Sequence, residues 1–148
     1  MGVGKSTVGA LLASRLGRPF VDLDAHIQGV EGVDIPTLFQ EGRFRAVEAR
    51  ALRQVLAQPP LVLATGGGAP CQPGAMDLLR ARGWTCWLQA PFEVLEQRVG
   101  TASGRPLWDV EVRQRFERRQ PIYAQAHACI GATGEDVAER VEEAWRAR

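Results

Sequence analysis

The sequence of 148 residues predicts an α/β fold in which helices cover both faces of a parallel sheet. Short apolar runs alternate with segments whose apolar residues recur at helical spacing, which is the rhythm of strand, helix and strand. Hydrophobic residues make up 45% of the chain and charged residues 24%, as in an ordinary globular protein. We therefore expect one domain over residues 1–148 with three or four parallel strands.

The predicted helices and strands follow one another along the whole chain. Helices are expected at 5–16, 35–57 (with a break near Gly42), 73–82, 91–99, 110–125 and 135–147, and short buried strands at 20–24, 61–64, 84–88 and 128–130. Residues 100–109 carry Gly, Ser and Pro and are predicted to form a mobile loop. In sheets of this kind ligands bind where the parallel strands end, so functional residues should gather at that edge.

Residues 2–7 have the sequence GVGKST, the closing part of the phosphate-binding motif G-x-x-x-x-G-K-[ST]. Its backbone N–H groups can surround one anion, Lys5 reaches the β- and γ-phosphates, and the Ser6 hydroxyl takes a Mg²⁺ coordination position. Lys5 is the only lysine among 18 basic residues. We expect a three-layer α/β/α fold like that of P-loop NTPases, with phosphate groups held by Gly2, Val3, Gly4, Lys5, Ser6 and Thr7.

The start of that motif is missing from the sequence. Its first Gly would lie two places before Met1, and the apolar strand that feeds such a loop is absent. In this fold the missing strand lies inside the sheet, and each buried backbone group left unpaired costs about 1–3 kcal/mol. We therefore expect Met1 to be an internal methionine of a chain that starts upstream.

Asp22 and Asp24 close the predicted strand 20–24 and, two residues apart, are expected to face the same side. One carboxylate can hold Mg²⁺ through water, and the other can orient a substrate hydroxyl and accept its proton. A helix cap is the alternative interpretation of D-x-D at a strand end. The position of the pair after GKST favours the functional interpretation.

Two further features are candidates for substrate binding. Arg45 suits bidentate capture of a carboxylate, with Glu48 holding it by an i,i+3 pair, although local spacing alone favours an ordinary solvated helix pair. Residues 65–68 (TGGG) follow a buried strand, and three successive glycines there favour contact between ligand and backbone over a simple turn.

Two arginines later in the chain are weaker candidates. Arg105, in the predicted loop, has the position of a lid arginine that covers the transferring phosphoryl group, or of an ordinary surface residue. Arg119 belongs to a helix crowded with arginines, most of which form a solvated face, and one of them can point inward to a carboxylate.

Composition excludes several functional classes. A formal net charge of +1 provides no basic field for nucleic acid or an anionic membrane, and no apolar run reaches membrane-spanning length. The three cysteines show no C-x-x-C spacing, which argues against a disulfide framework or a zinc site. No signal peptide opens the chain, so we expect a cytoplasmic protein with no nucleic-acid or membrane partner.

Taken together, these motifs resemble the shikimate kinase family. The matching elements are GVGKST, the Asp22/Asp24 pair, F-R-x-x-E from Phe44, the glycine run, R-P-L from Arg105 and R-x-P-[LI]-Y from Arg119, in the order of the family over about 120 residues. The resemblance implies ATP-dependent phosphorylation of the 3-hydroxyl of shikimate, with Mg²⁺, by a monomer. Residues 27–57 would then form the substrate-binding helices and residues 100–109 the lid.

The resemblance also implies a role for each candidate residue. Lys5 and Arg105 would act on the ATP phosphates, and Ser6 and Asp22 would hold Mg²⁺. Asp24 would bind the shikimate hydroxyls and act as the base. The remaining substrate contacts would come from Arg45, Gly67 and Arg119, with the two arginines clamping the carboxylate.

The sequence departs from the family pattern at Arg43, where Glu is usual after Gly42, and at Trp108, where an aliphatic residue is usual. Two other interpretations stay open: another small-metabolite kinase of this fold, such as a gluconate kinase, and a truncated nucleotide-binding remnant without activity. The glycine run and R-x-P-I-Y favour shikimate over gluconate, whereas the missing strand motivates the remnant.

Overall fold

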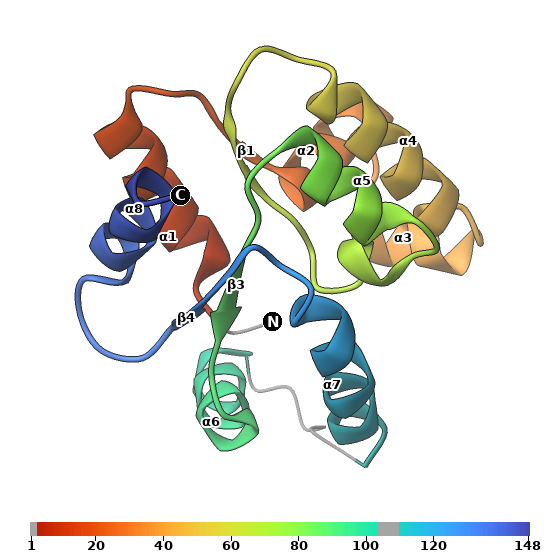
Figure 1. Ribbon diagram of the computed structural model, residues 1–148. Coiled ribbons are helices and arrows are strands. Elements are labelled where there is room, and N and C mark those ends of the chain that lie inside the picture. Colours follow the sequence, from red (N-terminus) through yellow and green to blue (C-terminus); the bar gives the residue numbers. More distant parts are fainter. Residues whose placement is uncertain (1–2, 104–109) are drawn as a thin grey trace. The chain divides into compact units, whose positions relative to one another are not determined.

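The computed structural model of the chain describes residues 3–103 and 110–148 (Figure 1). Gly2 and the greater part of the predicted lid, with Arg105 and Trp108, lie outside the described residues. The chain forms two compact units. One consists of residues 5–75, and the other combines the first four residues with residues 76–148, so we describe each unit by itself.

The unit of residues 5–75 contains a two-stranded parallel sheet and four α-helices. Its elements are α1 (Lys5–Leu16), β1 (Phe20–Asp22), α2 (Leu23–Glu31), α3 (Ile35–Gln40), α4 (Phe44–Leu56), β2 (Val62–Ala64) and the 3₁₀ turn η1 (Ala69–Cys71). In the register of β1 and β2, Phe20 lies opposite Val62 and Asp22 opposite Ala64. Both strands therefore end at the same edge of the sheet, where Asp22 is the last residue of β1 and the glycine run follows β2.

Apolar side chains from α2, α3 and α4 form the core of this unit. Its most deeply buried apolar residues are Leu23, Ile27, Leu38 and Val55. On the other side, α1 approaches β1 closely, because a Cβ atom at Gly9 would lie only 2.6 Å from the Phe20 ring. This packing holds α1 against β1, the two elements on which Ser6 and Asp22 lie.

The second unit holds the other pair of parallel strands. Its elements are α5 (Ala75–Arg82), β3 (Cys86–Gln89), α6 (Phe92–Ser103), α7 (Val110–Tyr123), β4 (Ala128–Gly131) and α8 (Val137–Arg146). Thr85 and His127 bond reciprocally where β3 and β4 begin: the Thr85 N–H donates to His127 Nδ1 and the His127 N–H to Thr85 Oγ1, both at 3.1 Å. Val3 packs into an apolar cluster of this unit with Ala90, Leu95 and Ala132.

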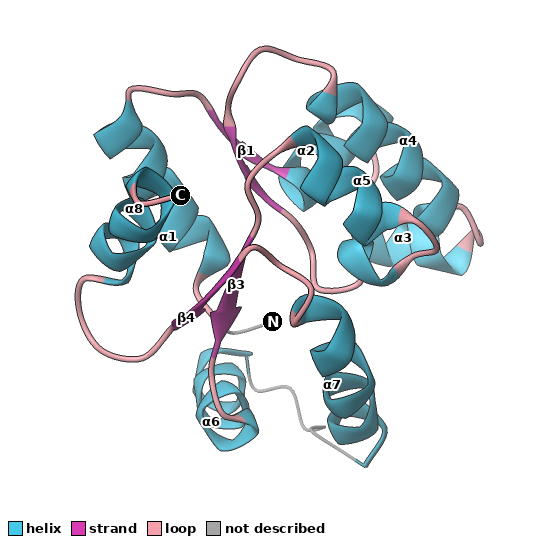
Figure 2. Ribbon diagram, viewed as in Figure 1, coloured by secondary structure: helices cyan, strands magenta, loops and turns pink. Residues whose placement is uncertain are grey.

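The predicted α/β class is confirmed, and the four strands found in residues 3–103 and 110–148 pair in parallel. Figure 2 shows how short the magenta strands are beside the cyan helices. In the described residues the strands form two separate pairs, β1–β2 and β3–β4, and not one continuous sheet. None of the helices in this part of the chain is long and apolar enough to cross a membrane.

Most predicted boundaries differ from the structure by a few residues, and two of these differences concern the predicted site and lid. The strand expected at 20–24 ends at Asp22, and the helix α2, which the sequence patterns did not predict, begins at Leu23. Residues 100–103, expected to be loop, continue the helix α6. A single glycine such as Gly100 weakens a helix by only about 1 kcal/mol and need not end it.

Candidate active site

The phosphate-binding motif leads directly into α1. Gly4 has a φ of +85°, a conformation that favours glycine, and Lys5 begins the helix. Ser6 and Thr7 lie in the first turn, where backbone N–H groups are not used by the helix itself and are available to an anion. Val3 has its side chain 8% exposed, so contact with a phosphate group would come from its backbone.

Asp22 links the start of α1 to the start of α2. Its Oδ2 accepts a hydrogen bond from Ser6 Oγ, and its Oδ1 accepts one from the Ala25 N–H at 3.1 Å as the N-cap of α2. The helix-cap interpretation of Asp22 is therefore correct, and the capping role leaves the carboxylate beside Ser6. Hydroxyl and carboxylate oxygens are ligands that Mg²⁺ prefers, so Ser6 and Asp22 fit that ion.

Asp24 lies in the first turn of α2 and shares no strand with Asp22, contrary to the prediction from the sequence. Helix geometry, and not strand alternation, therefore sets its direction. The Asp24 Oδ1 atom is buried, and no group in the described residues forms a hydrogen bond with it. Such an oxygen is available to a hydroxyl group, because a buried acceptor is costly to leave unpaired.

The surroundings of Asp24 also raise its pKa above the usual value. Burial is the main cause, followed by repulsion from Asp22, whereas Lys5 and Arg45 act in the opposite direction. A carboxylate with a raised pKa is a stronger base, which suits the acceptance of a substrate proton.

Arg45 lies in the first turn of α4 and contacts Glu48 as the sequence predicted. Its Nη1 lies 2.7 Å from Glu48 Oε1, and the Glu48 side chain is only 2% exposed, so this is not a solvated surface pair. The Arg45 guanidinium also lies 5.4 Å from the centroid of the Phe39 ring and 5.1 Å from that of Phe44. Phe39 was not recognised as part of the site, because an isolated aromatic residue carries no motif.

The glycine run turns back from the end of β2 towards the two charged groups. A Cβ atom at Gly66 would lie 3.2 Å from Asp24 Oδ2, and one at Gly68 would lie 2.5 Å from an Arg45 nitrogen. The carbonyl of Gly68 accepts from Gln72 Nε2 at 3.1 Å, and that of Gly67 accepts from Cys71 Sγ at 3.6 Å. The run therefore connects Asp24 with Arg45 inside the unit of residues 5–75.

Arg119 lies on α7 in the second unit and is half-buried. The binding of a substrate carboxylate by Arg119 stays a prediction. The roles of Arg105 and Gly2 also stay predictions, because both residues lie outside the described residues.

Comparison with known proteins identifies the family. A family model described as shikimate kinase matches residues 1–147. The chain belongs to the shikimate kinase family. The shikimate kinase of Persephonella marina is 38% identical over 149 residues, covering 97% of this chain and 91% of the relative. That of Bradyrhizobium diazoefficiens is 39% identical over 140 residues, covering 89% of this chain and 68% of the relative.

Solved structures agree with this assignment. The shikimate kinase of Aquifex aeolicus is 33% identical, with a TM-score of 0.87 and coverage of 99% of this chain and 92% of that one. The enzyme of Acinetobacter baumannii, solved in complex with shikimate, is 36% identical, with a TM-score of 0.83 and coverage of 99% and 86%. The predicted family, fold and enzyme class are thereby confirmed.

Proposed function

We propose that this protein transfers the γ-phosphoryl group of ATP to the 3-hydroxyl of shikimate. The observation that carries this proposal, given the family, is the buried Asp24 Oδ1 without a hydrogen-bond partner in the described part of the chain. A substrate hydroxyl would supply the missing donor. In the transfer, an O–P bond forms at the 3-oxygen, the bond between the γ-phosphorus and ADP breaks, and the hydroxyl proton moves to the Asp24 carboxylate.

Arg45 has the properties of a carboxylate receptor in this reaction. Its guanidinium presents a planar fork of N–H donors, it is held by the buried Glu48, and 39% of the side chain stays exposed to a ligand. We propose that Arg45 binds the shikimate carboxylate together with Arg119, while Gly67 contacts the substrate through its backbone. A clamp at one end and a base at the other would orient a small anionic polyol, and orientation supplies much of the rate in phosphoryl transfer.

Residues at the start of α1 serve the nucleotide in this proposal. The loop of residues 2–7 would surround the ATP phosphates, with Lys5 on the β- and γ-phosphates. Ser6 would ligate Mg²⁺ directly and Asp22 through water, and the bound ion would supply positive charge beside the phosphate oxygens. Arg105 would cover the transferring group from a lid over residues 100–109, which would exclude water.

We further propose that residues 1–148 form one catalytic domain, in which residues 27–57 bind shikimate. We also propose that the protein is a cytoplasmic monomer without nucleic-acid or membrane partners. A net charge of +1 supports the exclusion of nucleic acid, because affinity for nucleic acid depends on many cationic contacts. Gel filtration at several concentrations, with and without oligonucleotide, tests the oligomeric state and the partner class together.

A coupled assay of ADP release tests the activity. We expect ADP to form with shikimate and not with gluconate, under conditions of saturating ATP and Mg²⁺. Asp24→Asn keeps the shape of the side chain but removes the basic oxygen, so we expect turnover to fall by roughly 10²–10⁴. Turnover above about a tenth of the wild-type rate in that variant would contradict the role of Asp24 as base.

A further inference from the structure

Gly68 has no conformational reason to be glycine. Its φ of −86° and ψ of −20° lie in the right-handed helical region, which every residue adopts. Gly4, in contrast, has a positive φ that disfavours a side chain. The absence of a side chain at position 68 must therefore be explained by the space around it.

The guanidinium of Arg45 occupies that space. A Cβ atom at position 68 would lie 2.5 Å from Nη2, 2.6 Å from Nη1 and 2.9 Å from Cζ of Arg45, closer than real Cβ atoms approach other heavy atoms. Any side chain at this position would overlap the planar head of the arginine.

Other groups hold the same guanidinium. Glu48 Oε1 lies 2.7 Å from Nη1 and belongs to a side chain that is only 2% exposed, so Glu48 has little freedom to follow a displaced partner. The rings of Phe39 and Phe44 lie within cation–π distance of Cζ. Gly68, Glu48, Phe39 and Phe44 together form what we call the Arg45 seat.

We propose that Gly68 is a positioning residue for substrate binding, whose missing side chain lets Arg45 lie in this seat with its fork aimed at the shikimate carboxylate. This rests on the proposed role of Arg45. The interpretation differs from contact between ligand and glycine backbone, because here Gly68 acts through Arg45.

Gly68→Ala is the direct test. The guanidinium is the far end of a flexible side chain, so a methyl group at 68 would displace it while the backbone stays unstrained. We expect the variant to fold, the KM for ATP to stay unchanged, and the KM for shikimate to rise at least about tenfold through loss of the bidentate contact. The kcat should change less than the KM.

Gly83→Ala is the control. Gly83 directly follows α5, outside the proposed substrate-binding helices, and has no positive φ; a Cβ atom there would come no closer than 4.0 Å to a neighbouring group, the Leu79 carbonyl oxygen. We expect both KM values of this variant to stay within about twofold of wild type, as for a surface substitution away from structural features. A tenfold rise in Gly83→Ala would show that the effect at 68 is not specific to the Arg45 seat.

A double-mutant cycle separates the seat from a direct contact. In an Arg45→Ala background there is no guanidinium to displace, so Gly68→Ala should leave the KM for shikimate unchanged within about twofold. If Arg45→Ala proves unstable because Glu48 loses its partner, Arg45→Ala/Glu48→Gln serves as the background. An equal rise in KM with and without Arg45 would overturn the proposal.

A readout that does not use activity distinguishes this proposal from the proposed function. The Arg45 Nε–Hε signal in ¹⁵N NMR, assigned by its loss in Arg45→Ala, should shift in Gly68→Ala and not in Gly83→Ala. An unshifted signal refutes the seat, whatever the kinetics. A shifted signal, combined with an unchanged KM for shikimate in Arg45→Ala, supports the seat and refutes the role of Arg45 in binding the carboxylate.

Discussion

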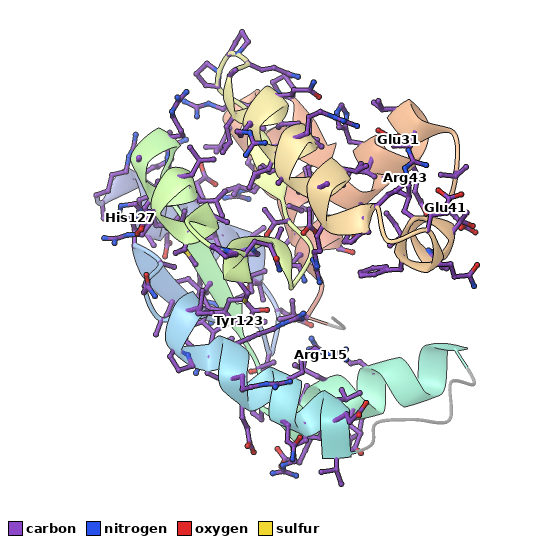
Figure 3. All side chains as sticks on the ribbon, turned by 90° about the vertical axis from the view of Figure 1, so that its right-hand side faces the viewer. Glu31, Glu41, Arg43, Arg115, Tyr123 and His127 are labelled. Atoms are coloured by element: carbon purple, nitrogen blue, oxygen red, sulfur yellow. The ribbon has the colours of Figure 1, made fainter. Side chains whose placement is uncertain are left out.

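Arg43 and Arg45 lie two residues apart at the start of α4 and make ion pairs of nearly equal length in different surroundings. Arg43 lies 2.6 Å from Glu41 and 3.1 Å from Glu31, and its side chain is 49% exposed (Figure 3). Arg45 lies 2.7 Å from Glu48, which is buried. The Glu48 side chain is 2% exposed, whereas that of Glu31 is 14% and that of Glu41 43% exposed, so the depth of the carboxylate, and not the distance, distinguishes the two arginines.

The difference has a physical basis. Exposed ion pairs contribute roughly 0–1 kcal/mol, because water screens the charges and two long side chains must be ordered. Removing the cation that pairs with a buried carboxylate, in contrast, strongly destabilises the fold, because the buried charge is left uncompensated. Arg43 pairs with both Glu31 and Glu41, and Arg50 also pairs with Glu31, at 2.9 Å. This network and the Arg45–Glu48 pair have no residue in common.

The largest effect is expected for Arg45→Ala. Glu48 would keep a buried charge without this cation, so we expect a loss of about 3 kcal/mol in the free energy of unfolding, the lower end for a broken buried pair. The KM for shikimate should also rise. Urea unfolding and steady-state kinetics measure the two quantities. A stability equal to that of wild type would remove the distinction between Arg43 and Arg45.

A smaller effect, dependent on pH, is expected at Asp24. Its pKa is raised in the folded protein, mainly by burial and then by Asp22, so the folded state binds this proton more tightly than the unfolded chain does. Folding stability from this group is therefore complete below the ordinary value of 3.8 and is lost as pH rises through the raised pKa. Asp24→Asn should thus become more stable relative to wild type with rising pH, and the gain should level off above the raised pKa.

Urea unfolding of both proteins across that pH range checks this expectation. A relative stability of Asp24→Asn that falls with rising pH would mean that the carboxylate is favoured by its surroundings, contrary to its burial.

The smallest effect is expected for Arg43→Ala. Loss of these solvent-screened pairs should lower the free energy of unfolding only slightly, and the loss should shrink at high salt because screening weakens the wild-type pairs. The KM for shikimate should stay within about twofold, the range of a surface substitution. Unfolding at low and high NaCl, with kinetics in parallel, measures both. A tenfold rise in this KM would show that the network, and not the Arg45 seat alone, holds the site.

The sequence predicted most elements of the fold because their signals are local. The bounds of α1 were predicted without error, since apolar residues recur at helical spacing between Lys5 and Leu16 and Gly17 follows the helix. The prediction of a strand over residues 20–24 was wrong at its end, because a short apolar segment does not distinguish a strand from the start of a helix. Asp22 has the signature of an N-cap, and that signal could have located α2.

The candidate site was predictable in its residue types and in the pair of Arg45 with Glu48, but not in its other contacts. GKST, the two aspartates, Arg45 and the glycine run were all found from spacing, and Ser6, Asp22, Asp24 and Arg45 lie in one unit. The burial of Glu48 and the group that fills the space at Gly68 depend on packing between α4 and the turn after β2, which no local pattern encodes. The roles of the individual residues stay predictions.

The most direct test of the account is the position of the phosphate in the product. Wild-type protein would be incubated with ATP, Mg²⁺ and shikimate, and the product analysed by ³¹P–¹H correlation NMR. We predict a phosphate coupled to the proton on C3 of shikimate, formed at least about a hundredfold more slowly by Asp24→Asn. A phosphate on another oxygen, no phosphorylated shikimate, or equal rates for the two proteins would contradict transfer to the 3-hydroxyl with Asp24 as base.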